Sequence, residues 1–139
     1  MYSWAFFALL SAGFAALVAI FGKIGLTGVD TTLATTVRAA IMAALLIAIS
    51  FALGKAGMLS TLSGKALVFI ALSGVAGALS WLFYFFALQK GPASGVAALD
   101  RLSVVFVLVL AVFFLGEHFT LKAVAGALLV VGGAILMSL

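Results

Sequence analysis

The stretch ALVFIALSGVAGALSWLFYFFALQ, residues 66–89, runs without a single charged side chain. A helix needs about 20 apolar residues to cross the hydrocarbon core of a bilayer. This stretch meets that length, residues 1–22 form a second charge-free run that also meets it, and residues 123–139 form a marginal one. These runs predict membrane-spanning helices.

Two further apolar runs contain charges where a bilayer disfavours them. Residues 39–54 and 102–116 are too short to span alone. The first reaches full length only by including Arg38, and the second only by including Asp100 and Arg101. An ionisable side chain inside a membrane span is costly, so such residues are candidates for a functional site.

The composition places the whole chain in a membrane. Of its 139 residues, 68% are hydrophobic and 7% are charged, with a mean hydropathy of +1.49, which no soluble fold of this size can bury. Residues 1–22 lack the basic start of a signal peptide, so we expect a retained first helix. The net charge of +4 comes from singly scattered lysines and arginines, which argues against nucleic-acid binding. We therefore expect a multi-pass protein of the cell (inner) membrane.

The fold class predicted is an all-α membrane protein with five transmembrane helices. The sequence lacks the period-2 alternation of barrel strands. Short loops rich in glycine, serine and one proline separate the helices. The predicted helices are residues 2–21, 31–53, 66–88, 95–115 and 121–139.

Metal and covalent chemistry find little support in the sequence. The chain has no cysteine, and a single histidine, His118, cannot build a metal site alone. No nucleophile and base are suitably spaced. We therefore expect no cofactor, no metal and no enzymatic activity.

The charged residues of the second and fourth helices are expected at one face of the membrane. Five helices alternate in direction, so these two enter from the same side. Arg38 would lie about 10 Å, and Asp100 and Arg101 about 7–9 Å, along their helices at 1.5 Å per residue. Asp100 can pair with Arg38 or with Arg101, which leaves one positive charge suited to an anionic or carboxylate-bearing solute. In the alternative, Arg38 snorkels to the interface, and Asp100 and Arg101 belong to a wet first helical turn.

Polar and aromatic groups also occur together near the end of the third helix. Ser80 and Tyr84 continue a stripe of small residues, and Trp81 lies between them. The stripe is typical of close helix packing, while Ser80, Trp81 and Tyr84 would suit a cavity wall. In the alternative, Trp81 and Tyr84 belong, with Tyr2 and Trp4, to interfacial aromatic belts.

The loop charges barely choose an orientation. Lysines fall on both predicted faces in similar numbers, so the positive-inside rule does not decide between the two insertions. Copies inserted in both directions would form an antiparallel dimer, the arrangement of inverted-repeat transporters.

The stretch WLFYFFALQKGPASGVAALDRLSVVFVLVLAVFFLGEHFTLKAVAGALLVVGGAILMSL, residues 81–139, has an aromatic helix end, then ALQ-G-AS, then a helix ending in LGE and a glycine-rich last helix. This order of features resembles the EamA-type domain of the drug/metabolite transporter superfamily. Residues 9–40, LLSAGFAALVAIFGKIGLTGVDTTLATTVRAA, resemble the shorter five-helix bacterial and archaeal members.

The resemblance implies a single EamA-like transmembrane domain over residues 1–139, equivalent to half of a ten-helix inverted-repeat transporter. It also implies an antiparallel homodimer that moves small solutes through a central cavity, and it adds Ser103 to the expected lining. Two departures stand out. Ser103 and Val104 occupy the region where many members have a proline that kinks the helix, and the first helix lacks a membrane glutamate for proton coupling.

The function that the sequence predicts is secondary transport of small polar or amphipathic solutes, such as metabolites, amino acids or drugs, by alternating access. Arg38 would attract or orient the solute, and Asp100 would pair with an arginine. The alternatives are a non-transporting subunit of a larger membrane complex and a passive channel or facilitator. The predicted solute-binding residues are Arg38, Ser80, Trp81, Tyr84, Asp100, Arg101 and Ser103.

Overall fold

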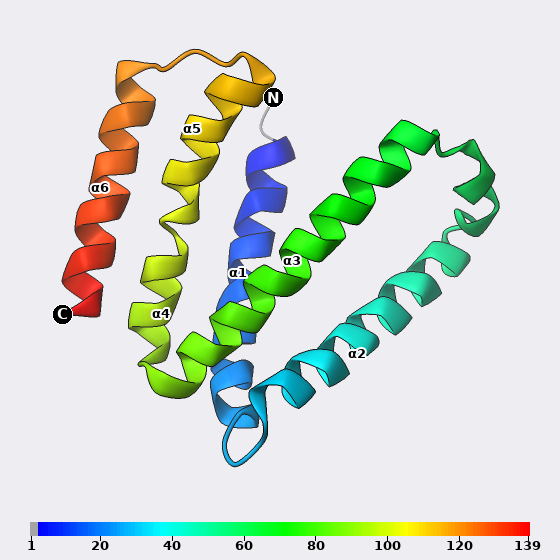
Figure 1. Ribbon diagram of the computed structural model, residues 1–139, viewed down its shortest axis with the longest axis horizontal. Coiled ribbons are helices and arrows are strands. Elements are labelled where there is room, and N and C mark those ends of the chain that lie inside the picture. The colour runs from blue at the N-terminus through cyan, green and yellow to red at the C-terminus, as the bar shows by residue number, and fades with distance from the viewer. Residues whose placement is uncertain (1–2) are drawn as a thin grey trace. The chain divides into compact units, whose positions relative to one another are not determined.

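The computed structural model describes residues 3–139, and every regular element within them is a helix (Figure 1). The predicted all-α class is therefore confirmed. Residues 1 and 2 lie outside the described part, and with them the predicted start of the first helix and the interfacial role of Tyr2. The elements are α1 (Ser3–Gly25), α2 (Thr31–Ala52), η1 (Ala56–Thr61), α3 (Gly64–Lys90), α4 (Ala93–Asp100), α5 (Ser103–Leu115) and α6 (Leu121–Ser138).

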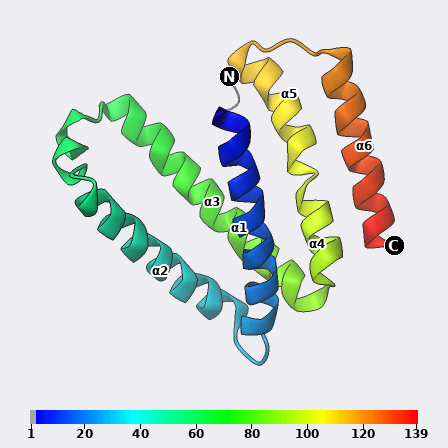
Figure 2. The same ribbon diagram turned by 180° about the vertical axis from the view of Figure 1, so that it is seen from behind.

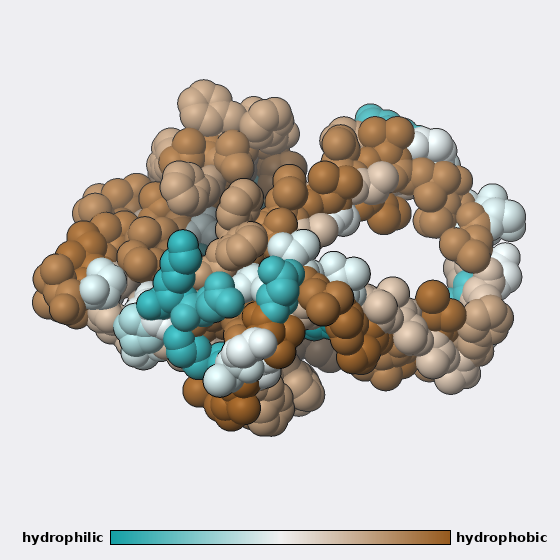
Figure 3. Space-filling model, turned by 60° about the horizontal axis from the view of Figure 1, so that its bottom comes forward, coloured by the Kyte–Doolittle hydropathy of each residue, from teal (hydrophilic) through white to brown (hydrophobic). Residues whose placement is uncertain are grey.

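Five segments of the described chain are long and apolar enough to cross a membrane, as predicted. They are α1, α2, α3, α4 together with α5, and α6. At most 6% of the 18-residue window that defines each span is buried within the chain. The face drawn in Figure 3 is accordingly covered mainly by hydrophobic side chains. A surface of this kind is stable only when lipid or other membrane protein covers it.

Side-chain caps and glycines fix several helix ends. The Asp30 carboxylate accepts a hydrogen bond of 2.8 Å from the Leu33 backbone N–H at the start of α2. Thr120 caps α6 in the same way, through a bond of 3.1 Å from the Ala123 N–H. Gly116 ends α5 with φ of 68°, a conformation that other residues rarely adopt. Asp and Thr are among the residue types that favour the start of a helix, and Gly favours its end.

The prediction of one continuous helix over residues 95–115 is wrong in one respect. The span is interrupted after Asp100, and α4 and α5 are separate helices. Arg101 and Leu102 donate their backbone N–H groups to the carbonyls three residues earlier, at 3.1 Å to Ala98 and 3.0 Å to Leu99. Bonds of this spacing tighten the turn and break the α-helical register without a proline. We call Asp100, Arg101 and Leu102 the span break.

The chain forms two compact units. The terminal unit contains the chain up to Lys23 together with Lys90–Leu139, and the α2–α3 unit contains Ile24–Gln89. The terminal unit thus holds almost all of α1 with α4, α5 and α6. The other unit holds α2, η1 and α3.

Small side chains allow α4 and α6 to lie side by side in the terminal unit, as both ribbon views show (Figure 2). Gly95 is buried, and a Cβ atom there would lie 3.2 Å from the Met137 carbonyl oxygen. Ala98 of α4 and Ala134 of α6 are also buried. Small residues on both helices thus allow this close approach.

The α2–α3 unit is held together where α2 begins and α3 ends. Thr31, Thr35, Phe85 and Leu88 are buried there. The Gln89 side-chain amide donates to the Val29 carbonyl at 3.5 Å. Elsewhere most side chains of α2 and α3 are exposed, so this end carries the contacts that position the two helices.

Candidate functional site

Arg38 lies inside the second membrane span. It follows the first residue of α2 by seven positions, which is about 10 Å along the helix axis. Its side chain is half-buried. A guanidinium at that depth needs partners other than bulk water.

Aromatic rings of α3 provide the contacts of Arg38. The guanidinium carbon lies 3.7 Å from the centroid of the Trp81 ring and 5.3 Å from that of Phe85. Both separations are within the range of cation–π attraction, which contributes about 0.5–2 kcal/mol depending on desolvation. Arg38 therefore packs against α3 rather than extending freely from α2.

The rings form a cluster of their own. Trp81 and Tyr84 meet edge to face, with centroids 5.4 Å apart and planes at 77°. Phe85 lies 5.8 Å from Trp81 and 6.1 Å from Tyr84. Phe85 is 3% exposed, so it anchors the cluster in the packed end of the unit. We call Arg38, Trp81, Tyr84 and Phe85 the Arg38 site.

The charge of Arg38 is not neutralised within its own unit. Asp30 is the only acidic residue between positions 24 and 89, and its carboxylate caps α2. Within these described residues, no hydrogen bond or ion pair involves the Arg38 guanidinium. Because no hydrogen bond within these residues occupies them, the N–H donors of the guanidinium remain available to another acceptor.

A hollow adjoins Arg38 on the surface of α2. Its volume is about 430 Å³. The other lining residues are apolar, and they include Leu33, Val37, Ile41 and Met42. The hollow is open, since Leu33, Val37 and Ile41 are all exposed, and it combines a mostly apolar wall with one charged group.

The remaining predicted site residues divide between the two units. Ser80 lies one turn before Tyr84 on α3 and is exposed. Asp100, Arg101 and Ser103 lie at or beside the span break in the terminal unit, and all three are exposed. Within the described part of that unit, Asp100 and Arg101 form no ion pair with each other. The structure thus brings together Arg38, Trp81 and Tyr84 of the predicted set, and the pairing of Asp100 with Arg38 stays a prediction.

Phe85 is the site residue that the sequence prediction missed. It follows Trp81 by four positions, so both rings lie on one face of α3. This spacing was visible in the sequence, but the many phenylalanines of the chain gave no reason to select one of them.

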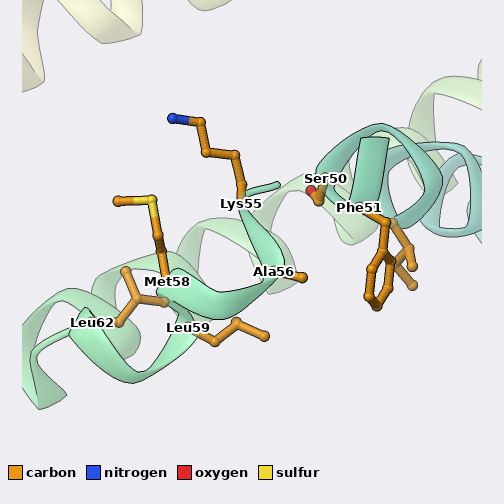
Figure 4. A pocket seen from close by; sticks show the side chains of 8 residues that line it. Ser50, Phe51, Lys55, Ala56, Met58, Leu59 and Leu62 are labelled. Atoms are coloured by element: carbon orange, nitrogen blue, oxygen red, sulfur yellow. The ribbon is translucent and has the colours of Figure 1, made fainter. Parts of the chain in front are cut away.

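Two other hollows lack the features of a solute site. One, of about 350 Å³, lies where α2 meets η1 and is lined mainly by apolar residues such as Met58 and Leu59 (Figure 4). Lys55 is its only charged lining residue. The other lies on α1 and is lined only by glycine, leucine and phenylalanine side chains. Among residues 3–139, no three histidine, cysteine or acidic side chains gather in a way that could hold a metal ion.

Comparison with known proteins gives consistent results. The model of the EamA-like transporter family matches residues 2–139. A Sinorhizobium sp. protein named "Uncharacterized transporter in cobO 3'region" is 43% identical over 136 residues, which cover 98% of this chain and 96% of the relative. No solved structure matches the chain. With five apolar spans and a family match over nearly its whole length, this multi-pass membrane protein belongs to the EamA-like transporter family.

Proposed function

We propose that this protein is a secondary transporter of small polar or amphipathic solutes and that Arg38 contacts the solute. The observation that carries the proposal is the Arg38 guanidinium, held 3.7 Å from Trp81 inside a membrane span without an acidic partner in its own unit. Retaining such a group in a membrane costs free energy, and contact with a solute would account for its presence. The family and the transporter name of the relative support a role in transport.

The aromatic residues have a positioning role in this proposal. Trp81 and Phe85 limit the rotamers that Arg38 can adopt, so less side-chain entropy is lost when a solute binds. Tyr84 supports Trp81 through its edge-to-face contact. Ser80 adds a hydroxyl on the same helix.

The span break contributes a second group of polar side chains within the membrane. Interrupted helices within membrane spans are where secondary transporters commonly bind solutes and ions. Asp100 and Arg101 lie at this interruption, and Ser103 begins the helix that follows it. We assign these three residues to the solute path.

The proposed working unit is an antiparallel homodimer that alternates access between the two membrane faces. The low burial of every span supports an oligomer, since a solute path must be walled from lipid. The relative is similar in length to this chain, so it too has room for about one such domain. Two oppositely inserted copies would supply the inverted repeat that alternating access uses.

Counterflow in proteoliposomes tests the transport proposal. Purified protein would be reconstituted and preloaded in turn with unlabelled amino acids, monocarboxylates and organic cations, and uptake of the matching labelled solute would be followed. We expect at least one class to exchange faster than in empty liposomes, and Arg38→Ala to remove that exchange. Exchange by an Arg38→Ala protein that is inserted normally would contradict the role of Arg38. Complete absence of flux for every class would favour the non-transporting subunit.

A driving-force measurement separates carrier from channel. A secondary transporter accumulates solute when an ion gradient or a counter-solute is imposed, whereas a facilitator only equilibrates it. We expect accumulation. Equilibration alone under every imposed gradient would favour the passive channel.

Site-directed labelling tests the dimer. The chain has no cysteine, so Ser60→Cys in η1 introduces a single thiol. Labelling of about half of the copies by an impermeant reagent on intact cells is the result expected from dual insertion. Labelling from one side only would exclude the antiparallel homodimer.

A further inference from the structure

We infer that the solute is an amphipathic monocarboxylate, with its carboxylate on Arg38 and its apolar body in the adjoining hollow. This inference rests on the transport function proposed above. It goes further by naming one solute class and the residues that select it.

The hollow carries one positive charge, which favours an anionic solute. The lining of the hollow contains Arg38 and no acidic residue. Asp30, the only acid of the α2–α3 unit, is engaged in capping α2 through the Leu33 N–H at 2.8 Å. A single uncompensated guanidinium is complementary to one negative charge on the solute. A second acidic group on the solute would find no basic partner among the apolar residues that complete the lining.

The second step concerns the geometry of the guanidinium. The centroid of the Trp81 ring lies 3.7 Å from the guanidinium carbon, and the ring contacts the group without accepting a hydrogen bond from it. The N–H donors point outward in the guanidinium plane, where a carboxylate can accept two parallel hydrogen bonds. The aromatic contacts thus hold Arg38 while leaving its donors for a planar acceptor.

The third step concerns the body of the solute. The hollow of about 430 Å³ falls within the size range of ligand sites. Leu33, Val37 and Ile41 follow one another along α2 at spacings of four and place their side chains on its wall. The hydrocarbon chain of an amphipathic solute would leave water when it lies against this wall.

The same contacts argue against an organic cation. A cation would seek the face of Trp81, and the Arg38 guanidinium already occupies that position. Displacing it would bring two positive charges together in a unit with one acidic residue. The aromatic cluster therefore serves to hold Arg38.

The test measures binding through the fluorescence of Trp81. Trp4→Phe leaves Trp81 as the sole tryptophan, because the chain has only two. The protein would be placed in phosphatidylcholine nanodiscs and titrated with hexanoate, hexanamide and hexylamine, which share one body and differ in charge. We expect a saturable change with hexanoate and binding at least about tenfold weaker for the neutral amide and for the amine, since charge-assisted hydrogen bonds are the stronger ones. Equal responses to all three would overturn the inference.

Two arginine variants and one control refine the result. Arg38→Gln is expected to abolish the selectivity for hexanoate over hexanamide. Arg38→Lys is expected to keep part of it, because the charge remains while the paired donors are lost. Lys65→Gln removes an equal charge at the start of α3 and should leave the selectivity unchanged. Unchanged selectivity in Arg38→Gln protein that elutes as the wild type does would overturn the inference.

The apolar wall has its own test. Ile41 is 64% exposed, so Ile41→Ala enlarges the hollow with little loss of internal packing. We expect the ratio of octanoate to hexanoate affinity to rise about threefold or more, because the space opened by the truncation takes up the two extra methylenes of octanoate. An unchanged ratio would show that the body lies elsewhere and would overturn this part of the assignment.

A lipid headgroup is the competing anion, and the nanodisc composition distinguishes it. Both lipids carry a phosphate, but only phosphatidylglycerol has a net negative headgroup that could bind Arg38 in place of a carboxylate. If Trp81 emission responds to phosphatidylglycerol nanodiscs and not to hexanoate, the site is a lipid site and the inference fails. Saturable hexanoate binding in both compositions supports it.

Failure of the binding inference and failure of the transport proposal give different experimental results. Carboxylate-selective binding without flux in liposomes would uphold this inference and contradict the proposed transport. Flux of a solute without a carboxylate, together with no hexanoate binding, would uphold transport and overturn this inference.

Discussion

The Arg38 site and the span break both place charge within membrane spans, but they treat it differently. At the first, Arg38 lies against Trp81 and Phe85 on a neighbouring helix. At the second, Asp100 and Arg101 are exposed at an interruption within a single span. A charge held by rings has a defined position, and a charge at a chain break has access but little positional restraint. We propose that the first region selects the solute and that the second lies along its path.

Neutralising the two arginines in turn is expected to give the largest difference. Arg38→Gln should lower the apparent affinity for a transported anion about tenfold or more, since losing a hydrogen bond to a charged group costs about 1.5–3 kcal/mol. Arg101→Gln should lower it less, because an exposed and unrestrained charge contributes less. Counterflow with varied solute concentration measures both. Equal losses in the two variants would remove the distinction between the regions.

Packing next to the span break gives the second prediction. Gly95→Val places side-chain atoms where a Cβ would already lie 3.2 Å from the Met137 carbonyl oxygen. Overpacking of this kind costs about 1–3 kcal/mol. Gly126→Val is the matched control in α6, because nothing lies within 4 Å of a Cβ there. Thermal unfolding in detergent should separate the two variants, and equal midpoints would contradict the close approach of α4 and α6.

The ring that holds Arg38 gives the third prediction. Trp81→Leu removes the ring contact and should weaken anion affinity about two- to thirtyfold, corresponding to about 0.5–2 kcal/mol of cation–π attraction and restraint. Phe83→Leu is the control, since Phe83 lies two positions away and is 66% exposed. The titration used for Arg38 cannot report here, because its fluorophore is lost, so counterflow is the measurement. Equal affinities in the two variants would show that Trp81 does not position Arg38.

The fold was predictable because hydropathy decides it. In a bilayer the backbone must satisfy its own hydrogen bonds, so long apolar runs become helices, and glycine, Asp30 and Thr120 fix their ends. The span break was not predictable in the same way. Residues 95–115 contain no proline. The interruption follows from the backbone N–H groups of Arg101 and Leu102, which donate to carbonyls three residues earlier, and no residue type at these positions predicts that pattern.

The candidate site was predictable only in part, because the sequence reveals unusual residues within a span but not the contacts between helices. Arg38 stands out because charge is rare in a span, and Trp81 and Tyr84 stand out as polar aromatic residues. The contact between Arg38 and Trp81 joins two helices far apart in sequence, so helical periodicity carries no information about it. Phe85 was missed because its role depends on that same contact.

Removing a helix cap is expected to have the smallest effect on stability, and it distinguishes α2 from the two helices at the span break. The Asp30 side chain caps α2, whereas α4 and α5, which flank the span break, begin without a side-chain cap. Asp30→Ala should therefore cost about 1 kcal/mol of stability. Asp30→Asn should keep the cap and remove the only acidic charge of the α2–α3 unit. Thermal unfolding of both variants measures the cap.

The Asp30→Asn variant also tests what sets the affinity of Arg38. Asp30 precedes Arg38 by eight positions, about 12 Å along α2, so its field at the guanidinium is weak and partly screened. We expect anion affinity to rise by less than about threefold in Asp30→Asn. A rise as large as the loss in Arg38→Gln would mean that the net charge of the unit controls affinity. A small rise would mean that affinity depends on the direct contact, which the rings of α3 hold in place.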